Sequence, residues 1–182
     1  VLSVLSCFGC SSPVHEDDRG CAFVSDSIQY RVEFMSAGCV RILSFPEGDT
    51  LVTRRLVVDS EKPAFKDYKW EDTGQKLLFR TRELSVVFDK ADVAFTFQET
   101  STGKLLLKEK GDRKARNFKR SVAGGEQCLE VTQRFVPTED EAIYGLGQYQ
   151  NGIMNYRGKS VLLLQANMDI VNPFLISTNG YG

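Results

Sequence analysis

The chain has 182 residues, of which 42% are hydrophobic and 26% charged, a composition ordinary for one globular domain with a sizeable core. Its 23 basic and 24 acidic residues leave a net charge of −1. Acidic residues interrupt the basic stretch 108–119, so we expect a solvated loop there and no nucleic-acid partner. His15, the sole histidine, excludes Ser-His-Asp catalysis and a histidine-rich metal site.

The first twenty residues differ in character from the rest of the chain. Residues 1–9 are apolar and uncharged but shorter than the roughly 20 residues that span a bilayer, which is typical of the end of a secretory signal. Cys7 and Cys10 each follow a small residue, as in the cleavage box of bacterial lipoproteins, and a polar stretch follows Cys10. We therefore predict a signal remnant or lipoprotein tether over 1–20, a lipid anchor on Cys10 or alternatively Cys7, and export to the periplasm or outer membrane.

The cysteines also allow other interpretations. A zinc site needs about four ligands, and no second pair matches Cys7 and Cys10, while a redox pair would need a strand-to-helix context. Residues 1–9 could also be the product of a cloning or gene-model boundary, an interpretation that ranks below export and above metal binding. Cys39 and Cys128 lie in strand-like segments, where we expect buried free thiols, and a disulfide between them stays open. We expect no metal and no cofactor.

From Cys21 onward apolar and polar residues alternate with a period of two, which places one side of a strand in a core and the other in water. The clearest alternation lies in 28–34, 93–97 and 129–135. No long segment shows the helical period of about 3.6 residues. Further predicted strands are 40–45, 51–58, 76–82, 84–88, 104–107 and 161–165.

Glycine-containing turns separate these strands, among them 46–49, 72–74 and 101–103. The Gly124-Gly125 pair between two strand patterns predicts a tight hairpin, since such turns need positive φ. Many short strands with frequent turns predict an all-β fold, an antiparallel β-sandwich, over residues 21–182. The 12 Phe and 6 Tyr residues suffice to fill the space between two sheets.

The segment from Glu141 to Lys159 is dense in Gly, Asn, Gln and Tyr. Amides donate and accept at once, and tyrosine combines a flat apolar face with a polar tip, so these residues suit sugar-contacting surfaces. A glycine-rich connection between strands is the alternative. A phosphate cradle at Gly145-Leu-Gly147 is rejected, because the third glycine and the following helix of such loops are missing.

Four motifs follow one another at this end of the chain: Tyr144-Gly-Leu-Gly-Gln148, Asn155-Tyr-Arg-Gly158, Pro173-Phe-Leu-Ile-Ser177 and Asn179-Gly-Tyr-Gly182. Their order resembles the end of the N-terminal, galactose-mutarotase-like domain of glycoside hydrolase family 31. Many family members carry Glu at the position of Gln148. The combination of Gln148 with the Asn155-Tyr-Arg-Gly158 motif resembles the bacterial α-xylosidase branch. The resemblance covers roughly residues 22–182.

This resemblance implies a retaining α-glycosidase, whose two catalytic carboxylates lie about 5–5.5 Å apart. In the family both are aspartates of a (β/α)8 barrel that follows the sandwich. The chain would then end before its own barrel, would carry no catalytic residue, and would serve an enzyme acting on α-linked, xyloglucan-type oligosaccharides. The acidic run Glu139-Asp-Glu141 is accordingly interpreted as a solvated turn or loop after Pro137.

The family's sandwich sends a loop toward the substrate pocket, and by position this loop lies between Tyr156 and Pro173. Within it we select Gln165, Asn167 and Asp169 as sugar contacts near the non-reducing end. The competing interpretation is that Asn167 and Asp169 only shape a turn through side-chain-to-backbone hydrogen bonds.

Other functions fit the sequence less well. An aldose epimerase would share the architecture but needs histidines, which His15 alone cannot supply. A stand-alone carbohydrate-binding sandwich would need an aromatic platform, for which Tyr149, Tyr156 and Trp70 are available. An α-glucosidase of the same family would differ mainly in barrel residues. The ordered motifs argue against a purely structural lipoprotein domain.

Overall fold

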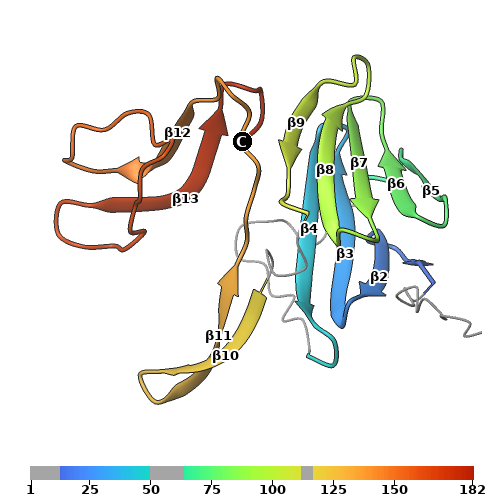
Figure 1. Cartoon of the computed structure of the whole chain (residues 1–182), viewed down its shortest axis with the longest axis horizontal. Helices are drawn as coiled ribbons and strands as arrows, with labels where there is room; N and C mark the ends of the chain where they lie inside the picture. Colours follow the sequence, from blue (N-terminus) through green and yellow to red (C-terminus); the bar gives the residue numbers. More distant parts are fainter. Residues whose placement is uncertain (1–12, 50–63, 112–116) are drawn as a thin grey trace, which may run out of the picture.

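The alternating segments form antiparallel strands in the computed structural model, which describes residues 13–49, 64–111 and 117–182. One sheet has four strands in the order β1 (His15–Glu16), β2 (Cys21–Ser25), β3 (Ile28–Ser36) and β4 (Cys39–Pro46). The other has five, in the order β5 (Lys69–Asp72), β6 (Lys76–Arg80), β7 (Leu84–Asp89), β8 (Ala94–Glu99) and β9 (Leu105–Lys108). The two sheets face each other as a sandwich (Figure 1).

Two further hairpins lie outside these sheets (Figure 1). One pairs β10 (Asn117–Ala123) with β11 (Glu126–Thr132), and the other pairs β12 (Ile143–Gln148) with β13 (Ile170–Ser177). Between them the chain returns to the edge of the five-stranded sheet, where the backbone N–H of Val136 donates to the carbonyl of Lys108 at 2.8 Å. None of the described residues forms a helix long and apolar enough to cross a membrane.

Aromatic rings from both sheets fill the core of the sandwich. The ring of Phe88 lies 4.8 Å from that of Phe23 and 5.1 Å from that of Tyr30, across the gap between the sheets. Phe95 stands 4.9 Å from Phe88 on the neighbouring strand. Every second residue of the facing strands points into this core, which confirms the all-β antiparallel sandwich that the alternation predicts.

The Gly124-Gly125 turn forms as predicted. Ala123 pairs with Glu126, and the two glycines between them have φ of 60° and 84°, the left-handed values that this kind of two-residue hairpin requires. The predicted strand 51–58 lies outside the described residues.

The β10–β11 hairpin differs from the prediction. The alternation in 129–135 predicts one face in the core, yet Leu129 and Val131 are 37% and 58% exposed, and the burial pattern of β11 is exposed over nearly its whole length. The start of this hairpin also falls in the stretch 108–119, for which the sequence predicts a loop. Alternation indicates a strand, but it does not say whether anything covers its apolar side.

The predicted strand 161–165 is wrong, because these residues form no strand. They belong to a long connection between β12 and β13. The run of leucines at 162–164 is exposed rather than buried. A short apolar run without alternation does not identify a strand.

The folded part of the chain starts earlier than the sequence indicates. Residues 13–20, which the sequence assigns to a tether, contain β1, and His15 pairs with Ala22 of β2. The Asp17 carboxylate accepts two hydrogen bonds from the Arg31 guanidinium, at 2.9 and 2.5 Å. These donated hydrogen bonds, which outweigh the opposing effect of burial, hold the pKa of Asp17 well below its ordinary value. Cys7 and Cys10 lie outside the described residues.

The described cysteines also depart from expectation. Cys39 and Cys128 are exposed free thiols rather than buried ones, and no disulfide joins them. Cys21 is the buried thiol, and burial raises its pKa to about 11, so it stays protonated at neutral pH.

Candidate functional site

The motifs of the C-terminal part meet in the β12–β13 hairpin, which the structure places beside the β9 edge of the sandwich (Figure 1). The strands pair with a bulge between Gly145 and Gly147. A Cβ on Gly145 would lie 2.6 Å from the Phe174 carbonyl oxygen, and one on Gly147 would lie 2.0 Å from the Ile170 carbonyl oxygen. The glycines are therefore needed for close approach of two strands, which is the plain strand connection that the sequence allows as an alternative.

One face of this hairpin is apolar and exposed. Tyr144 pairs with Ile176 and Gln148 pairs with Ile170, so these side chains share a largely apolar face, to which the strand period adds Phe174 and the polar Asn172. Phe174 is 51% exposed and Ile176 53%. Exposed apolar side chains gathered on one sheet face are typical of a surface that another part of the protein covers.

A cluster of hydrogen bonds closes the base of the hairpin around the carboxylate of Glu141. Ser177 Oγ donates to Glu141 Oε1 at 2.6 Å, the Tyr181 hydroxyl donates to the same oxygen, and the Thr138 backbone N–H donates to Oε2 at 3.0 Å. Asn179 Nδ2 donates to the Thr138 hydroxyl at 2.7 Å. We call these residues, with Arg157, the Glu141 cluster.

The Asn155-Tyr-Arg-Gly158 motif supplies further bonds to the same place. Arg157 Nη1 donates to the carbonyls of Thr138 and Glu141, at 2.6 and 2.7 Å. Asn155 Oδ1 accepts the backbone N–H of Ile143 at 3.1 Å, and the Tyr156 backbone N–H donates to the Ile143 carbonyl at 2.8 Å. This motif therefore holds the beginning of β12.

Glu141 is the residue that sequence reasoning misplaces. The sequence places it in a solvated turn, but it is only 3% exposed, whereas Glu139 and Asp140 are exposed as expected. Burial acts to raise the pKa of Glu141, yet the hydrogen bonds from Ser177, Tyr181 and Thr138 outweigh burial and hold that pKa below its ordinary value. Its partners Ser177 and Tyr181 lie 36 and 40 residues further along, so no local pattern signals the contact.

The burial of Tyr181 has its own consequence. Desolvation, reinforced by the hydrogen bond to Glu141, raises the pKa of Tyr181 to about 12. Its phenol is therefore protonated at neutral pH and acts as a donor.

The structure places Gln165, Asn167 and Asp169 together in the connection 149–169, which we call the 149–169 loop. Gln165 shapes it: its Nε2 donates to the Asp169 carbonyl at 3.0 Å, and its Oε1 accepts the Val171 N–H at 3.1 Å. A short antiparallel bridge joins Ala166 to Asp169. Asn167 is exposed and Asp169 is half-buried. The side chain that bonds to the backbone in this turn is therefore that of Gln165, for which the sequence predicts only a sugar contact.

Two tyrosines in the first part of this loop contact each other. The rings of Tyr149 and Tyr156 meet edge to face at 6.4 Å, and Tyr156 is buried. Desolvation raises the pKa of Tyr149, with smaller contributions from Tyr156 and from the charge of Asp169. The Tyr149 hydroxyl donates to the Leu146 carbonyl at 2.9 Å. Trp70 lies on β5, at the far side of the sandwich (Figure 1), so it shares no platform with the tyrosines.

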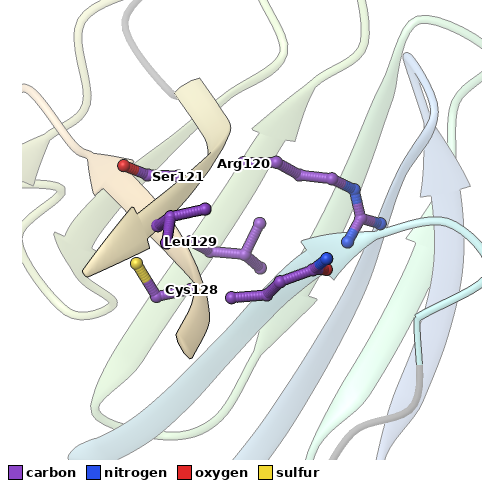
Figure 2. A pocket seen from close by; sticks show the side chains of 6 residues that line it. Arg120, Ser121, Cys128 and Leu129 are labelled. Carbon is purple, nitrogen blue, oxygen red and sulfur yellow. The ribbon is translucent and has the colours of Figure 1, made fainter. Parts of the chain in front are cut away.

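An open pocket of about 430 Å³ lies on the β10–β11 hairpin (Figure 2). Arg120 at its edge is engaged by Asp49, whose Oδ1 accepts from Nη2 at 3.0 Å. The residues that line the pocket are Arg120, Ser121, Val122, Gln127, Cys128 and Leu129. This pocket contains none of the residues that the sequence selects. In the described part of the chain, no group of three or more His, Cys, Asp or Glu side chains could hold a metal ion.

Comparison with known proteins decides the family. A sequence model described as the glycosyl hydrolase 31 N-terminal galactose mutarotase-like domain matches residues 29–182. The chain belongs to this family. The match starts inside β3 and contains all four motifs, so the resemblance drawn from their order is confirmed.

The relatives of this family 31 domain include α-xylosidases. The chain is 32% identical over 171 residues to an α-xylosidase of Saccharolobus solfataricus, covering 86% of the chain and 22% of that protein. It is 28% identical to the crystal structure of a family 31 α-xylosidase from Xanthomonas citri, with a TM-score of 0.75 over 91% of the chain and 18% of that protein. The chain thus spans about a fifth of the length of these relatives.

The same fold occurs in family 31 enzymes that are not α-xylosidases. A family 31 dextranase of Flavobacterium johnsoniae, solved with isomaltotriose, matches 94% of the chain with a TM-score of 0.68 at 16% identity. That likeness shows the shared fold alone. The β-sandwich of this family 31 domain therefore does not fix which sugar is cleaved.

Proposed function

We propose that this chain is the non-catalytic N-terminal part of a retaining α-glycosidase, an α-xylosidase acting on xyloglucan-type oligosaccharides. The observation that carries the proposal is the 32% identity to an α-xylosidase across 171 residues. A retaining mechanism needs two carboxylates about 5–5.5 Å apart, one as nucleophile and one as general acid/base. We assign both to the remaining four-fifths of the protein, so the chain by itself is expected to be inactive.

The same family contains an alternative specificity. The chain is 39% identical over 67 residues to an uncharacterized family 31 glucosidase of Pseudescherichia vulneris, covering 37% of the chain. An α-glucosidase is therefore the second candidate. Xylose and glucose differ by a hydroxymethyl group, and we assign its recognition to barrel residues.

We assign the apolar face of β12–β13 to the contact with the enzyme's own C-terminal (β/α)8 barrel. Tyr144, Ile170, Phe174 and Ile176 lie on this face, and all four are at least 38% exposed. Aromatic and branched apolar side chains gathered on one sheet face favour a large protein partner over water. The N-terminal domain, which the sequence predicts over 21–182, also includes β1 at His15–Glu16 in this division of the protein.

The 149–169 loop is assigned to the substrate. Gln165, Asn167 and Asp169 are its proposed contacts to the sugar near the non-reducing end, and Gln165 also shapes the loop through its two backbone hydrogen bonds. An exposed amide and a carboxylate suit hydroxyl groups, because the amide donates and accepts and the carboxylate accepts strongly. Tyr149, whose ring meets that of Tyr156 in the same loop, offers an apolar ring face of the kind that suits a sugar ring.

We further propose that the protein is exported and lipid-anchored through Cys10, with Cys7 as the alternative, to the periplasmic or outer membrane surface. The support is the apolar run 1–9 and the small residue before each cysteine. Detergent partitioning and mass spectrometry of the protein made with its native leader would test this. Retention of anchoring in both Cys10→Ala and Cys7→Ala would contradict it.

The deciding experiment is an assay of the full-length protein on p-nitrophenyl α-D-xyloside and α-D-glucoside. We expect preferential cleavage of the xyloside. Preferential cleavage of the glucoside would favour the second candidate, and hydrolysis of neither would remove the enzyme assignment.

The loop assignment is tested in the same assay. Asp169→Asn and Asn167→Ala are expected to raise KM or lower kcat severalfold, because a contact to the substrate is lost. Exposed Glu139, which lies outside this loop, serves as the control through Glu139→Ala. Unchanged kinetics in both loop variants would contradict the assignment.

A further inference from the structure

The Glu141 cluster draws together parts of the chain that are far apart in sequence. Thr138 and Glu141 precede β12, Arg157 lies in the 149–169 loop, and Ser177 ends β13. Tyr181, which also donates to Glu141, follows β13 by four residues in the sequence. One buried carboxylate at the base of the hairpin therefore accepts hydrogen bonds from the segment before β12 and from the end of β13 and the segment after it. The arginine of the loop bonds to the Glu141 carbonyl at the same place.

The cluster also joins the hairpin to the sandwich. Lys104, in the turn before β9, donates from Nζ to the Asn179 carbonyl at 2.9 Å, and Asn179 in turn donates to the Thr138 hydroxyl. The hairpin and the sandwich thus meet at the cluster, next to the β9 edge (Figure 1).

The donors around the Glu141 side chain require a hydrogen-bond acceptor at this position. Both oxygens of Glu141 accept, Oε1 from two hydroxyls and Oε2 from a backbone N–H that cannot turn away. An apolar side chain would leave these donors buried without partners, at a cost of about 1–3 kcal/mol for each group. A glutamine keeps one acceptor oxygen, and the hydroxyls can rotate to accept from its amide.

The position of Glu141 gives it control over the register of β12 against β13. Ile143, two residues after Glu141, pairs with Ser177, the residue that donates to the carboxylate. A slip of one residue would turn every side chain of a strand to the opposite face. At the other end of the hairpin, a Cβ on Gly147 would lie 2.0 Å from the Ile170 carbonyl oxygen, so the observed pairing needs a glycine at this place.

We propose that Glu141 is a positioning residue, which fixes the β12–β13 register and through it the placement of the 149–169 loop against the substrate. This inference rests on the proposed function for its kinetic consequence. Its structural consequence is that order in the 149–169 loop depends on the Glu141 carboxylate at the base of the hairpin. This consequence can be tested whether or not the protein is active.

The test uses the full-length protein with Glu141→Ala, Glu141→Gln and the control Glu139→Ala, which removes an exposed carboxylate two residues earlier. Hydrogen exchange is followed by mass spectrometry over 143–169 and over β6–β8. We expect Glu141→Ala to speed exchange in 143–169 and not in β6–β8. It should raise KM about fivefold or more while kcat changes less than about twofold, because substrate binding is lost rather than chemistry.

The conservative variant separates positioning from mere burial. Glu141→Gln is expected to recover most of the exchange protection and most of KM, and Glu139→Ala should match the wild type. Should Glu141→Ala fail to fold, Tyr181→Phe removes a single donor and is expected to give the same pattern at smaller amplitude.

Two results would overturn the inference: unchanged exchange in 143–169 in Glu141→Ala, or equally faster exchange in β6–β8, which marks a general loss of stability. A wild-type protein that hydrolyses neither glycoside would refute the proposed function alone, since the exchange measurement would still decide whether Glu141 positions the loop.

Discussion

The indole N–H of Trp70 donates a hydrogen bond to Glu16 Oε2 at 2.9 Å, which ties the first strand of one sheet to the first strand of the other. Tyr68 donates to the second oxygen of the same carboxylate at 3.0 Å. These bonds lower the pKa of Glu16, with that from Trp70 contributing most. β1 therefore fastens one edge of the sandwich.

The Trp70–Glu16 bond predicts a small loss of stability in Trp70→Phe, which keeps the aromatic ring and removes the donor. We expect the free energy of unfolding to fall by about 1 kcal/mol, because the hydrogen bond is exposed to water, although the Trp70 ring packs partly buried against the core. Urea unfolding of the variant beside Glu71→Gln, an exposed neighbour on β5, measures this. A decrease equal to that of the control would show that the bond contributes nothing.

The core predicts a much larger effect at Phe88. Its ring packs between Phe23, Tyr30 and Phe95, and the side chain is completely buried. Phe88→Ala should lower the free energy of unfolding, measured by urea titration, by about 3–5 kcal/mol, through lost burial and the cavity left behind.

Phe174→Ala is the matched control for Phe88→Ala. In this chain the substitution should change the stability by no more than about 0.5 kcal/mol, because Phe174 is half exposed. In the full-length protein its effect should grow if the barrel covers this face. Equal effects of Phe174→Ala in both settings would argue against that contact.

The glycines of the β12–β13 hairpin predict a contrast between two alanine substitutions. In Gly147→Ala the new Cβ would lie 2.0 Å from the Ile170 carbonyl oxygen at φ +119°, so the strands must separate. At Gly152, with φ +67°, a new Cβ would meet no atom within 4 Å, and Gly152→Ala should cost only about 1–2 kcal/mol of left-handed strain. Hydrogen exchange in β13 should therefore accelerate in Gly147→Ala and not in Gly152→Ala.

Glu141 predicts a pH dependence of stability with a definite sign. Its pKa in the folded protein lies below its ordinary value, so its contribution is complete above the unfolded pKa of about 4.3 and is lost as the pH falls through the folded pKa. Asp17 contributes with the same sign. The stability difference between wild type and Glu141→Gln should therefore shrink as the pH falls below about 4.3, which unfolding at several pH values measures. A difference independent of pH would contradict the assignment of charge to Glu141.

Much of the fold follows from local pattern. The alternation at 28–34 predicts a strand that the structure contains, because a half-buried strand must alternate whatever its partner is. The strand-like segments 76–82 and 84–88 likewise contain β6 and nearly all of β7. The Gly124-Gly125 turn follows in the same way from the φ values that only glycine adopts easily. The four motifs likewise indicate the family by their order along the chain alone.

The remainder depends on contacts that no local pattern records. The run at 161–165 is apolar but forms a loop, and β11 alternates without a core beneath it, because burial depends on what another segment covers. Glu16 joins the fold through Trp70, 54 residues away.

The sequence by itself determined the all-β class and the family. Only the tertiary structure decided that Glu141 is buried at the base of the hairpin. An acidic residue beside Glu139 and Asp140 looks solvated, and it becomes a buried acceptor only because Ser177 and Tyr181 return to it from about forty residues along the chain. Donors supplied by distant segments offset the cost of burying its charge, and such donors are set by the fold and not by the neighbouring sequence.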